Sequence, residues 1–447
     1  MSAPRTVFGW LAGAIPALVL AAGACSSDDD PVAPPPPEVE AGADADAAPD
    51  APPDAAVDAD AGAALVDASP EPIVCAVSPC AVEIAAGADS VCVRVQDGTV
   101  QCWGANTSGE LGRGPGAGAS SGTPARVAGL TGVTQLAGGA SDPGDTFCAR
   151  KDDGSVVCWG SNAHGNLGRV LDDDTVDLEP SPTAAPVAGV AGATGVFVGS
   201  AVSCATLSSQ GVACWGTNGA SQLPDRPSGA LDAFPASPVA LDAGVVQLGI
   251  ADRGTVALTT DATLLSWGVR GALLGPSTGV LGREVSLDVA LPGPIDLARV
   301  SAIAASIGRA CAVANGRVFC WGAGPSAGSD SVYPTPTGVG VDLAYAQSLS
   351  VGPRTVCATL SDGVARCWGD NSKGQLGNGN TDLQPIPVTV QGLAGRAVRM
   401  ATMEATTCAI LVTGAVQCWG QNDQGQLGIG TADGLASLTP RAVTLAP

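Results

Sequence analysis

The chain has 447 residues, with 42 acidic against 20 basic side chains and a net charge of −22 at pH 7. Binding to a phosphate backbone requires clustered Lys and Arg side chains, and the sequence contains no such cluster. We therefore expect no nucleic-acid partner, and the search for function turns to the distribution of the remaining residues along the chain.

Residues 1–25 have the features of an export signal peptide. Arg5 supplies a positive charge, apolar residues follow from Val7 to Leu20, and small residues precede Cys25. The segment is too short and wrongly flanked for a membrane span. A cysteine directly after small residues resembles the lipobox of bacterial lipoproteins, which implies that Cys25 is lipidated. A cleaved signal with an incidental cysteine is the alternative.

Residues 26–72 differ in composition from the rest of the chain. They contain 13 Asp or Glu, 10 Pro and 14 Ala, with no Lys or Arg. Such a segment has little apolar surface to bury and repels itself, so we expect a disordered spacer. The spacer would hold residues 73–447 away from a membrane to which lipid alone attaches the protein.

The dipeptide Trp-Gly recurs through residues 73–447 at intervals of about fifty residues. A fixed period of this size is typical of repeat architectures. The seven tryptophans of this repeat are Trp103, Trp159, Trp215, Trp267, Trp321, Trp368 and Trp419.

Cysteines recur with the same period and indicate disulfides. The repeated pairs are Cys92 with Cys102, Cys148 with Cys158, Cys204 with Cys214, Cys311 with Cys320, Cys357 with Cys367, and Cys408 with Cys418. Cys75 and Cys80 form a local seventh pair, and the fourth repeat has Val256 and Ser266 instead. An exported protein meets an oxidising compartment, which favours disulfides. Zinc is the competing interpretation, but one pair per repeat does not build a tetrahedral site.

The spacing between paired cysteines predicts β-hairpins. Asn315-Gly316 lies midway between Cys311 and Cys320, as expected for a two-residue turn. Asp97-Gly98 lies between the first pair and suits a three-residue loop. In both hairpins the cysteines fall at a non-hydrogen-bonded position, where facing side chains are closest. In the third repeat Gly211 comes one place late, so a different turn is expected.

Each repeat contains the same parts in order. A short apolar strand such as 81–85 comes first, followed by the hairpin, a polar turn such as 106–112 and a Pro-led strand such as 123–127. Short strands separated by Gly and Pro indicate an all-β protein. Four strands per repeat, seven times over, predict a seven-bladed β-propeller over 73–447. The signal peptide 1–25 and the disordered acidic Pro/Ala linker 26–72 precede it.

Residues 357–377 read Cys-Ala-x-x-x-Asp-Gly, then Cys-Trp-Gly-x-Asn-x-x-Gly-Gln-Leu-Gly. This pattern resembles the repeat of the regulator of chromosome condensation family. The resemblance implies a seven-bladed propeller whose termini share a blade, so that a strand near residues 440–445 pairs near the N-terminal end. Repeats four and five depart from the pattern: Leu274-Gly275 is a fragment of the polar turn, and residues 322–330 lack it.

The sequence offers few catalytic or stacking residues. The repeat tryptophans are expected to pack between blades. The other aromatic candidates are Tyr333, Tyr345, Phe147, Phe197, Phe234 and Phe319. His164 is the single histidine, and the repeated Asp97, Asp153 and Asp362 suit turns. We expect no catalytic residue, no enzyme activity and no cofactor.

One acidic run, residues 171–179, follows the second repeat. Its candidate ligands for Ca²⁺ are Asp172, Asp173, Asp174 and Asp177, although the spacing of an EF-hand is absent. A solvated loop and a docking site for a basic partner are the other interpretations.

We expect a cell-surface lipoprotein that presents a rigid propeller as a protein-interaction scaffold. It would be a monomer at the outer membrane or cell surface of a Gram-negative bacterium, or alternatively in the periplasm. Resemblance to secreted bacterial propellers makes inhibition of an extracellular enzyme the alternative function. Guanine nucleotide exchange, the activity of the family namesake, fits export poorly. The partner protein cannot be identified from the residues.

Overall fold

The computed structural model describes residues 71–171, 175–209, 211–227, 230–269, 279–285, 289–323, 332–340, 343 and 345–447. The signal peptide with Cys25 and almost all of the linker lie outside these ranges, as do Asp172, Asp173 and Asp174. The expectations for lipidation and for the acidic run therefore remain predictions.

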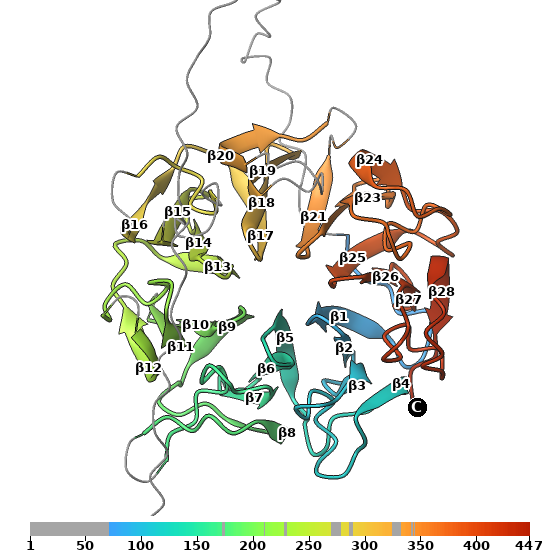
Figure 1. Ribbon diagram of the computed structural model, residues 1–447, viewed down its shortest axis with the longest axis horizontal. Coiled ribbons are helices and arrows are strands. Elements are labelled where there is room, and N and C mark those ends of the chain that lie inside the picture. The colour runs from blue at the N-terminus through green and yellow to red at the C-terminus, as the bar shows by residue number, and fades with distance from the viewer. Residues whose placement is uncertain are drawn as a thin grey trace, which may run out of the picture. The chain divides into compact units, whose positions relative to one another are not determined.

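Residues Ala63–Pro447 form a compact unit that contains seven four-stranded antiparallel sheets. Each sheet is one blade of a β-propeller, and its four strands follow one another in sequence. The first strands of the blades surround the centre in Figure 1. The all-β, seven-bladed propeller expected from the sequence is confirmed, and the described residues include no helix that is both long and apolar enough to cross a membrane.

The strands of blades one to three are β1 (Ala81–Ala86), β2 (Ser90–Val95), β3 (Val100–Ala105), β4 (Ser120–Arg126), β5 (Val133–Ala140), β6 (Asp145–Lys151), β7 (Val156–Gly160), β8 (Ser181–Pro186), β9 (Ala193–Val198), β10 (Val202–Leu207), β11 (Val212–Asn218) and β12 (Ala230–Val239). Those of blades four and five are β13 (Val245–Ile250), β14 (Gly254–Thr259), β15 (Leu264–Val269), β16 (Val289–Ile295), β17 (Val300–Ser306), β18 (Arg309–Ala314), β19 (Arg317–Ala323) and β20 (Val332–Gly338). Those of blades six and seven are β21 (Ala346–Val351), β22 (Thr355–Leu360), β23 (Ala365–Gly369), β24 (Gln384–Thr389), β25 (Ala397–Thr402), β26 (Thr406–Leu411), β27 (Val416–Gly420) and β28 (Ser437–Val443).

The second and third strands of a blade form the disulfide-bridged hairpin. In each of the six repeated cysteine pairs the sulfurs are bonded and the Cα atoms are 4.1 Å apart. This short Cα separation is that of a non-hydrogen-bonded pair, where side chains across two strands lie closest. In blade four Val256 and Ser266 face each other in the same register.

The observed disulfides are the pairs that the spacing predicts. The bonds within the hairpins join Cys92 with Cys102, Cys148 with Cys158, Cys204 with Cys214, Cys311 with Cys320, Cys357 with Cys367, and Cys408 with Cys418. The seventh bond joins Cys75 with Cys80, just before the first blade. All fourteen cysteines that were assigned to disulfides are therefore paired as expected.

The hairpin turns of blades one and five have the expected geometry. In blade five Ala314 pairs with Arg317, and both intervening residues have positive φ, as in a type I′ turn. In blade one the Val95 amide donates to the Thr99 carbonyl at 2.8 Å. The Asp97 carboxylate accepts from the Thr99 amide at 2.9 Å, which holds the loop closed.

The glycine of Trp-Gly is required by a bulge. Gly104 has φ +106°, and the strand register shifts between Cys102 and Gly104. A Cβ atom at Gly104 would lie 2.3 Å from the carbonyl oxygen of Asp89, so a side chain cannot be accommodated. The same close approach to the preceding turn recurs after the other repeat tryptophans, as at Gly420.

The expectation that the C-terminal strand pairs near the N-terminal end of the propeller is wrong. Strand β28 pairs with β27 and completes blade seven. Because blade seven has four strands of its own, the edge that another strand would occupy is already filled. The ring is joined instead by flanking segments: the Val74 amide donates to Val412 O at 2.7 Å, and Gln101 exchanges two hydrogen bonds with Ala446.

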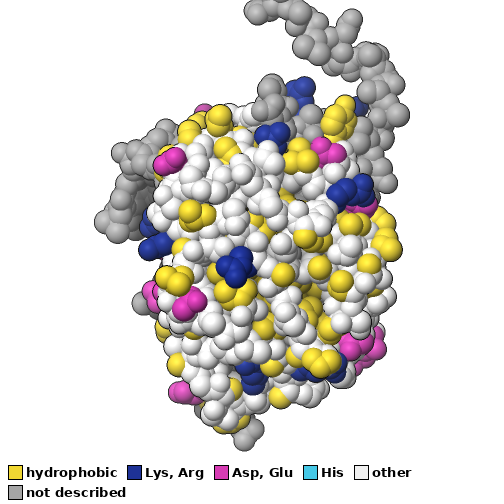
Figure 2. Space-filling model, turned by 90° about the vertical axis from the view of Figure 1, so that its right-hand side faces the viewer, with side chains coloured by type: hydrophobic (Ala, Val, Ile, Leu, Met, Phe, Trp, Pro, Cys, Tyr) yellow, Lys and Arg dark blue, Asp and Glu magenta, His cyan; other side chains and the backbone are white. Residues whose placement is uncertain are grey.

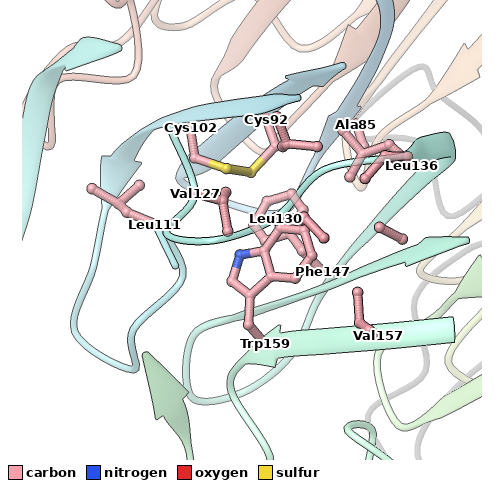
Figure 3. Close-up of a cluster of buried hydrophobic side chains, with 13 residues drawn as sticks. Ala85, Cys92, Cys102, Leu111, Val127, Leu130, Leu136, Phe147, Val157 and Trp159 are labelled. Carbon is pink, nitrogen blue, oxygen red and sulfur yellow. A yellow bond between two sulfur atoms is a disulfide. The ribbon is translucent and has the colours of Figure 1, made fainter. Parts of the chain in front are cut away.

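The apolar core is divided among the spaces between neighbouring blades. Figure 3 shows one of these clusters, in which the disulfide between Cys92 and Cys102 of blade one lies near Trp159 of blade two. Trp159 stacks with Phe147, with ring centroids 5.9 Å apart. All seven repeat tryptophans are buried, which confirms that they pack within the propeller.

The tryptophans also bind blade to blade through hydrogen bonds. In six blades the indole N–H donates to a backbone carbonyl in the polar turn of the preceding blade, at 2.7–2.9 Å. The pairs are Trp103 with Gln426, Trp159 with Glu110, Trp215 with Asn166, Trp267 with Gln222, Trp321 with Val280 and Trp419 with Gln375.

A buried leucine follows each accepting residue, and a glycine follows the leucine in five of the six turns, whereas blade three has Pro224 there. The leucines are Leu111, Leu167, Leu223, Leu281, Leu376 and Leu427. An asparagine five places earlier caps five of them, as when Asn106 Oδ1 accepts from the Leu111 amide at 2.9 Å. A Cβ atom at Gly428 would lie 2.8 Å from Trp103 Nε1, so glycine gives this turn the room to approach the tryptophan closely.

Trp368 is the exception. It is fully buried, but its indole N–H finds no acceptor among the described residues. The preceding blade is the fifth, whose sequence lacks the Asn-to-Leu-Gly turn.

The Trp368 exception predicts different effects of one substitution at two sites. Trp215→Phe leaves the buried Asn166 carbonyl without its donor, whereas Trp368→Phe removes no hydrogen bond to any described residue. Both variants lose similar apolar contacts. We expect Trp215→Phe to lower the free energy of unfolding by about 1–3 kcal/mol more than Trp368→Phe. Urea denaturation measures both, and equal losses would contradict the assignment.

Candidate functional site: an acidic mouth

A cavity of about 470 Å³ opens at the end of the propeller where the first and second strands of the blades are joined. Its lining includes Asp89, Glu110, Asp142, Asp145 and Glu404, and we call this group the acidic mouth. Among the described residues that line it there is no Lys or Arg.

Turns from three blades bring the acidic mouth together. Asp89 lies between β1 and β2, Asp142 precedes β6, and Glu404 lies between β25 and β26. Glu110 comes from the polar turn after β3. The first strands of the blades surround one axis, so the turns that follow them meet at one end (Figure 1). Loops held on such a rigid frame are well suited to binding.

Asp145 forms the floor of the acidic mouth and joins two blades. From the start of β6, its carboxylate accepts from the amides of Ala88, Asp89 and Ser90 in the neighbouring blade, at 2.7, 3.2 and 3.0 Å. Burial raises the pKa of Asp145 to about 6, because loss of hydration outweighs these hydrogen bonds.

Asp89 lies beside two further carboxylates. Burial raises its pKa, and the negative charges of Asp423 and Glu404 raise it further. Gln426 Nε2 donates to Asp89 Oδ1 at 3.0 Å and opposes the increase. Glu404 has a long contact of 3.9 Å with Arg354, and both side chains are more than half exposed, so this pair contributes little.

The acidic mouth is therefore chemically suited to a cation. Carboxylates that are partly buried near one another favour the proton, and a lysine or arginine side chain from a partner would favour their charged form. A metal site is a different matter: within the described ranges, no group of three or more His, Cys, Asp and Glu is arranged to hold a metal ion.

Most residues singled out from the sequence lie elsewhere. Phe147 is buried, and Tyr333 and Tyr345 are exposed outside the acidic mouth. Asp177, the described one of the four candidate Ca²⁺ ligands, accepts from the Glu179 amide at 2.9 Å and thus stabilises its own loop. His164 is half-buried in the polar turn of blade two.

Sequence reasoning missed the acidic mouth because its carboxylates are far apart in the chain, from Asp89 in blade one to Glu404 in blade seven. Each belongs to a separate turn, and none is part of a charged run. The signal that could have found them is positional: Asp89, Asp142 and Glu404 each follow the first strand of a repeat. Aligning the seven repeats on their first strands would have placed these three together.

The side of the propeller that carries β24 and β28 shows no comparable group among its described residues. Figure 2 shows the side that carries β24 and β28, where acidic, basic and apolar side chains are interspersed. Charges distributed in this way give no field of one sign.

Comparison with known proteins supports the repeat assignment. The Regulator of chromosome condensation (RCC1) repeat matches residues 97–141 and 362–410, and a second model of the same repeat matches 81–110 and 346–375. The chain is 29% identical over 333 residues to the E3 ubiquitin-protein ligase HERC2 of Homo sapiens, an alignment that covers 71% of this chain and 7% of HERC2. It is 29% identical over 153 residues to the ultraviolet-B receptor UVR8 of Arabidopsis thaliana, covering 32% of this chain and 34% of UVR8.

Solved structures show the same fold. Prp20p from Saccharomyces cerevisiae matches with a TM-score of 0.64 at 19% identity, covering 80% of this chain and 86% of Prp20p. Human WBSCR16 matches with a TM-score of 0.59 at 18% identity, covering 73% and 85% of the two chains. The chain spans a small part of the length of the curated relatives, so their activities do not transfer with the fold.

The raised pKa of Asp145 predicts a pH-dependent stability. Between pH 4 and 6 the unfolded chain ionises while the folded protein keeps the proton, so the contribution of this group to stability is lost as pH rises through 6. Moving from pH 7.5 to 5 should thus add about 1–1.5 kcal/mol to the free energy of unfolding. Asp145→Asn should remove this increment, and the exposed Asp153→Asn should retain it. The same pH dependence in all three proteins would refute the prediction.

Proposed function

We propose that this propeller, which is built from RCC1 repeats, is an exported lipoprotein whose acidic mouth binds a basic segment of a partner protein. The observation that carries the proposal is the gathering of five carboxyl groups around one cavity whose described lining has no basic side chain. A basic segment would supply the opposite charge that this lining lacks, and further hydrogen-bond donors to its carboxylates.

The architecture supports a scaffold that binds without catalysis. Asp145 is only 2% exposed, and its carboxylate accepts hydrogen bonds from three backbone amides. This carboxylate therefore already serves to join two blades. General acid–base work needs a carboxyl group within hydrogen-bond reach of the substrate. A structural carboxylate at the floor of the cavity and exposed ones at its margin suit recognition of charge better.

Known propellers of this fold bind proteins. One solved structure holds Kap60 bound to yeast RCC1 (Prp20), and another reports the binding of Prp20p to Gsp1p and histones. These partners belong to those proteins. For this chain, the fold supports a protein partner and the acidic mouth supports a basic one.

The proposed location is the outer membrane or the cell surface. The seven disulfides support an oxidising compartment. A lipid at Cys25 would anchor the chain, and the acidic linker 26–72 would hold the acidic mouth clear of the surface.

The acidic mouth predicts charge-dependent peptide binding. Asp142 and Glu404 are exposed, so Asp142→Asn with Glu404→Gln should keep the fold while removing two charges. The full-length chain is titrated with a peptide of alternating lysine and glycine, by calorimetry at 50 and 300 mM NaCl. We expect the double variant to bind at least about fivefold more weakly, and higher salt to weaken binding of the unaltered chain.

The matched control removes the same charge elsewhere. Asp382 and Glu179 are also exposed acidic residues, and they lie outside the acidic mouth. Asp382→Asn with Glu179→Gln should leave the affinity unchanged. If both double variants weaken binding equally, general net charge is responsible and the proposed site is wrong.

The anchor has its own prediction. Metabolic labelling with a fatty acid should mark the unaltered chain, and Cys25→Ala should lose the label and leave the membrane fraction. Retention of Cys25→Ala on membranes would remove the proposed tether, without affecting the binding assignment.

A further inference from the structure

A second cavity lies between blades five and six. Its volume is about 180 Å³, and the side chains that line it include Tyr333, Val339, Trp368 and Ile386. Tyr333 and Ile386 are exposed at its margin, at 39% and 68%, whereas Trp368 is fully buried. The buried indole N–H of Trp368 has no acceptor among the described residues, so an unsatisfied donor lies at the wall of an apolar cavity.

The other interblade spaces show what this cavity lacks. In each of the other six, the preceding blade supplies a carbonyl to the indole N–H, and the next residue is a buried leucine. In blade one this residue is Leu111, followed by Gly112, whose Cβ position would meet Val127 and Trp159. The equivalents of Val127 and Trp159 are Val339 and Trp368, which both line the cavity.

The sequence of blade five offers no leucine for this place. The segment between β19 and β20, residues 324–331, reads Gly-Pro-Ser-Ala-Gly-Ser-Asp-Ser and contains no leucine or other large aliphatic residue. The corresponding segment between β23 and β24, residues 370–383, contains Gln375, Leu376 and Gly377.

A backbone donor at the cavity is also without its usual partner. In blades one, two and six the amide after the last core valine donates to the carbonyl of the turn glycine at 2.9 Å: Ala128 to Gly112, Ala188 to Gly168 and Gln391 to Gly377. Gly340 has this place in blade five. Its amide makes no such bond within the part of the chain that the structure describes. Two donors whose counterparts in other blades bond to this turn therefore have no acceptor among the described residues.

We propose that this cavity binds a Leu-Gly turn presented by a partner protein. The carbonyl of the residue before the leucine accepts from Trp368 Nε1–H, the leucine side chain fills the cavity, and the glycine carbonyl accepts from the Gly340 amide. An arginine after the glycine extends the match, because Arg113 of blade one donates to the Cys102 and Thr123 carbonyls. This site is separate from the acidic mouth and does not depend on it.

The test uses the full-length chain labelled with ¹⁵N at tryptophan and the peptide acetyl-Gly-Gln-Leu-Gly-Arg-amide. The indole signal of Trp368 is assigned by its loss in Trp368→Phe. We expect a saturable shift of this signal, with the other repeat indoles unmoved. A peptide with alanine in place of leucine should bind at least about tenfold more weakly, because it loses the apolar burial.

Two protein variants separate the proposed contact from a general loss of structure. Trp368→Phe should weaken peptide binding at least about fivefold, measured by calorimetry, because it removes the donor and keeps an apolar wall. Trp215→Phe, whose indole is bonded to Asn166, should leave the affinity unchanged despite its lower stability.

Three results would overturn the proposal. The first is the absence of a saturable Trp368 shift, or equal binding of the leucine and alanine peptides. The second is a Trp368 indole protected from hydrogen exchange in dilute protein without peptide, which would mean that the chain fills its own cavity. The third is concentration-dependent protection of Trp368 with dimer formation, which would make a second copy the occupant.

Discussion

The hydrogen bond from a buried tryptophan to the carbonyl of the preceding blade connects the parts of this propeller. A buried carbonyl without a donor costs more than a typical hydrogen bond contributes, so the indole and the polar turn are needed together. The turn brings its backbone close to an aromatic ring, and in five of the six turns a glycine after the leucine gives room for this approach. The leucine amide of the turn must also have an acceptor, which the asparagine side chain provides. The tryptophan of one blade and the polar turn of the preceding blade are thus the two halves of one interaction.

The disulfides differ from the tryptophan hydrogen bonds because they act within single blades. Each lies inside one hairpin, whose turn already determines the register, and blade four keeps that register with Val256 facing Ser266. The bridge therefore stabilises a hairpin without being needed to specify it. Contact between blades depends on the tryptophans, all seven of which are present. This division explains how both cysteines of one repeat can be replaced while its tryptophan remains.

Local patterns were sufficient to predict the hairpins, the disulfides and the seven blades, because turn residues and cysteine spacing act over about ten residues. They were insufficient for ring closure. Strand β28 lies beside β27, and the choice between that edge and the first blade depends on which edge the whole ring leaves open. The acidic mouth was missed for a related reason. Asp89, Asp145 and Glu404 share a cavity through the closed ring, and no short stretch of sequence records that proximity.

Blades that depart from the repeat are the places where residues can serve function and not only the fold. A propeller with seven identical interblade spaces would satisfy every indole internally and present nothing specific there. The sequence of blade five lacks the Asn-to-Leu-Gly turn. Blade six nevertheless keeps the buried Trp368, to which such a turn would bond. Local inconsistency of this sort concentrates at functional sites in natural proteins. The six regular interblade spaces indicate what the seventh would bind, because each of them contains the kind of turn that the seventh fits.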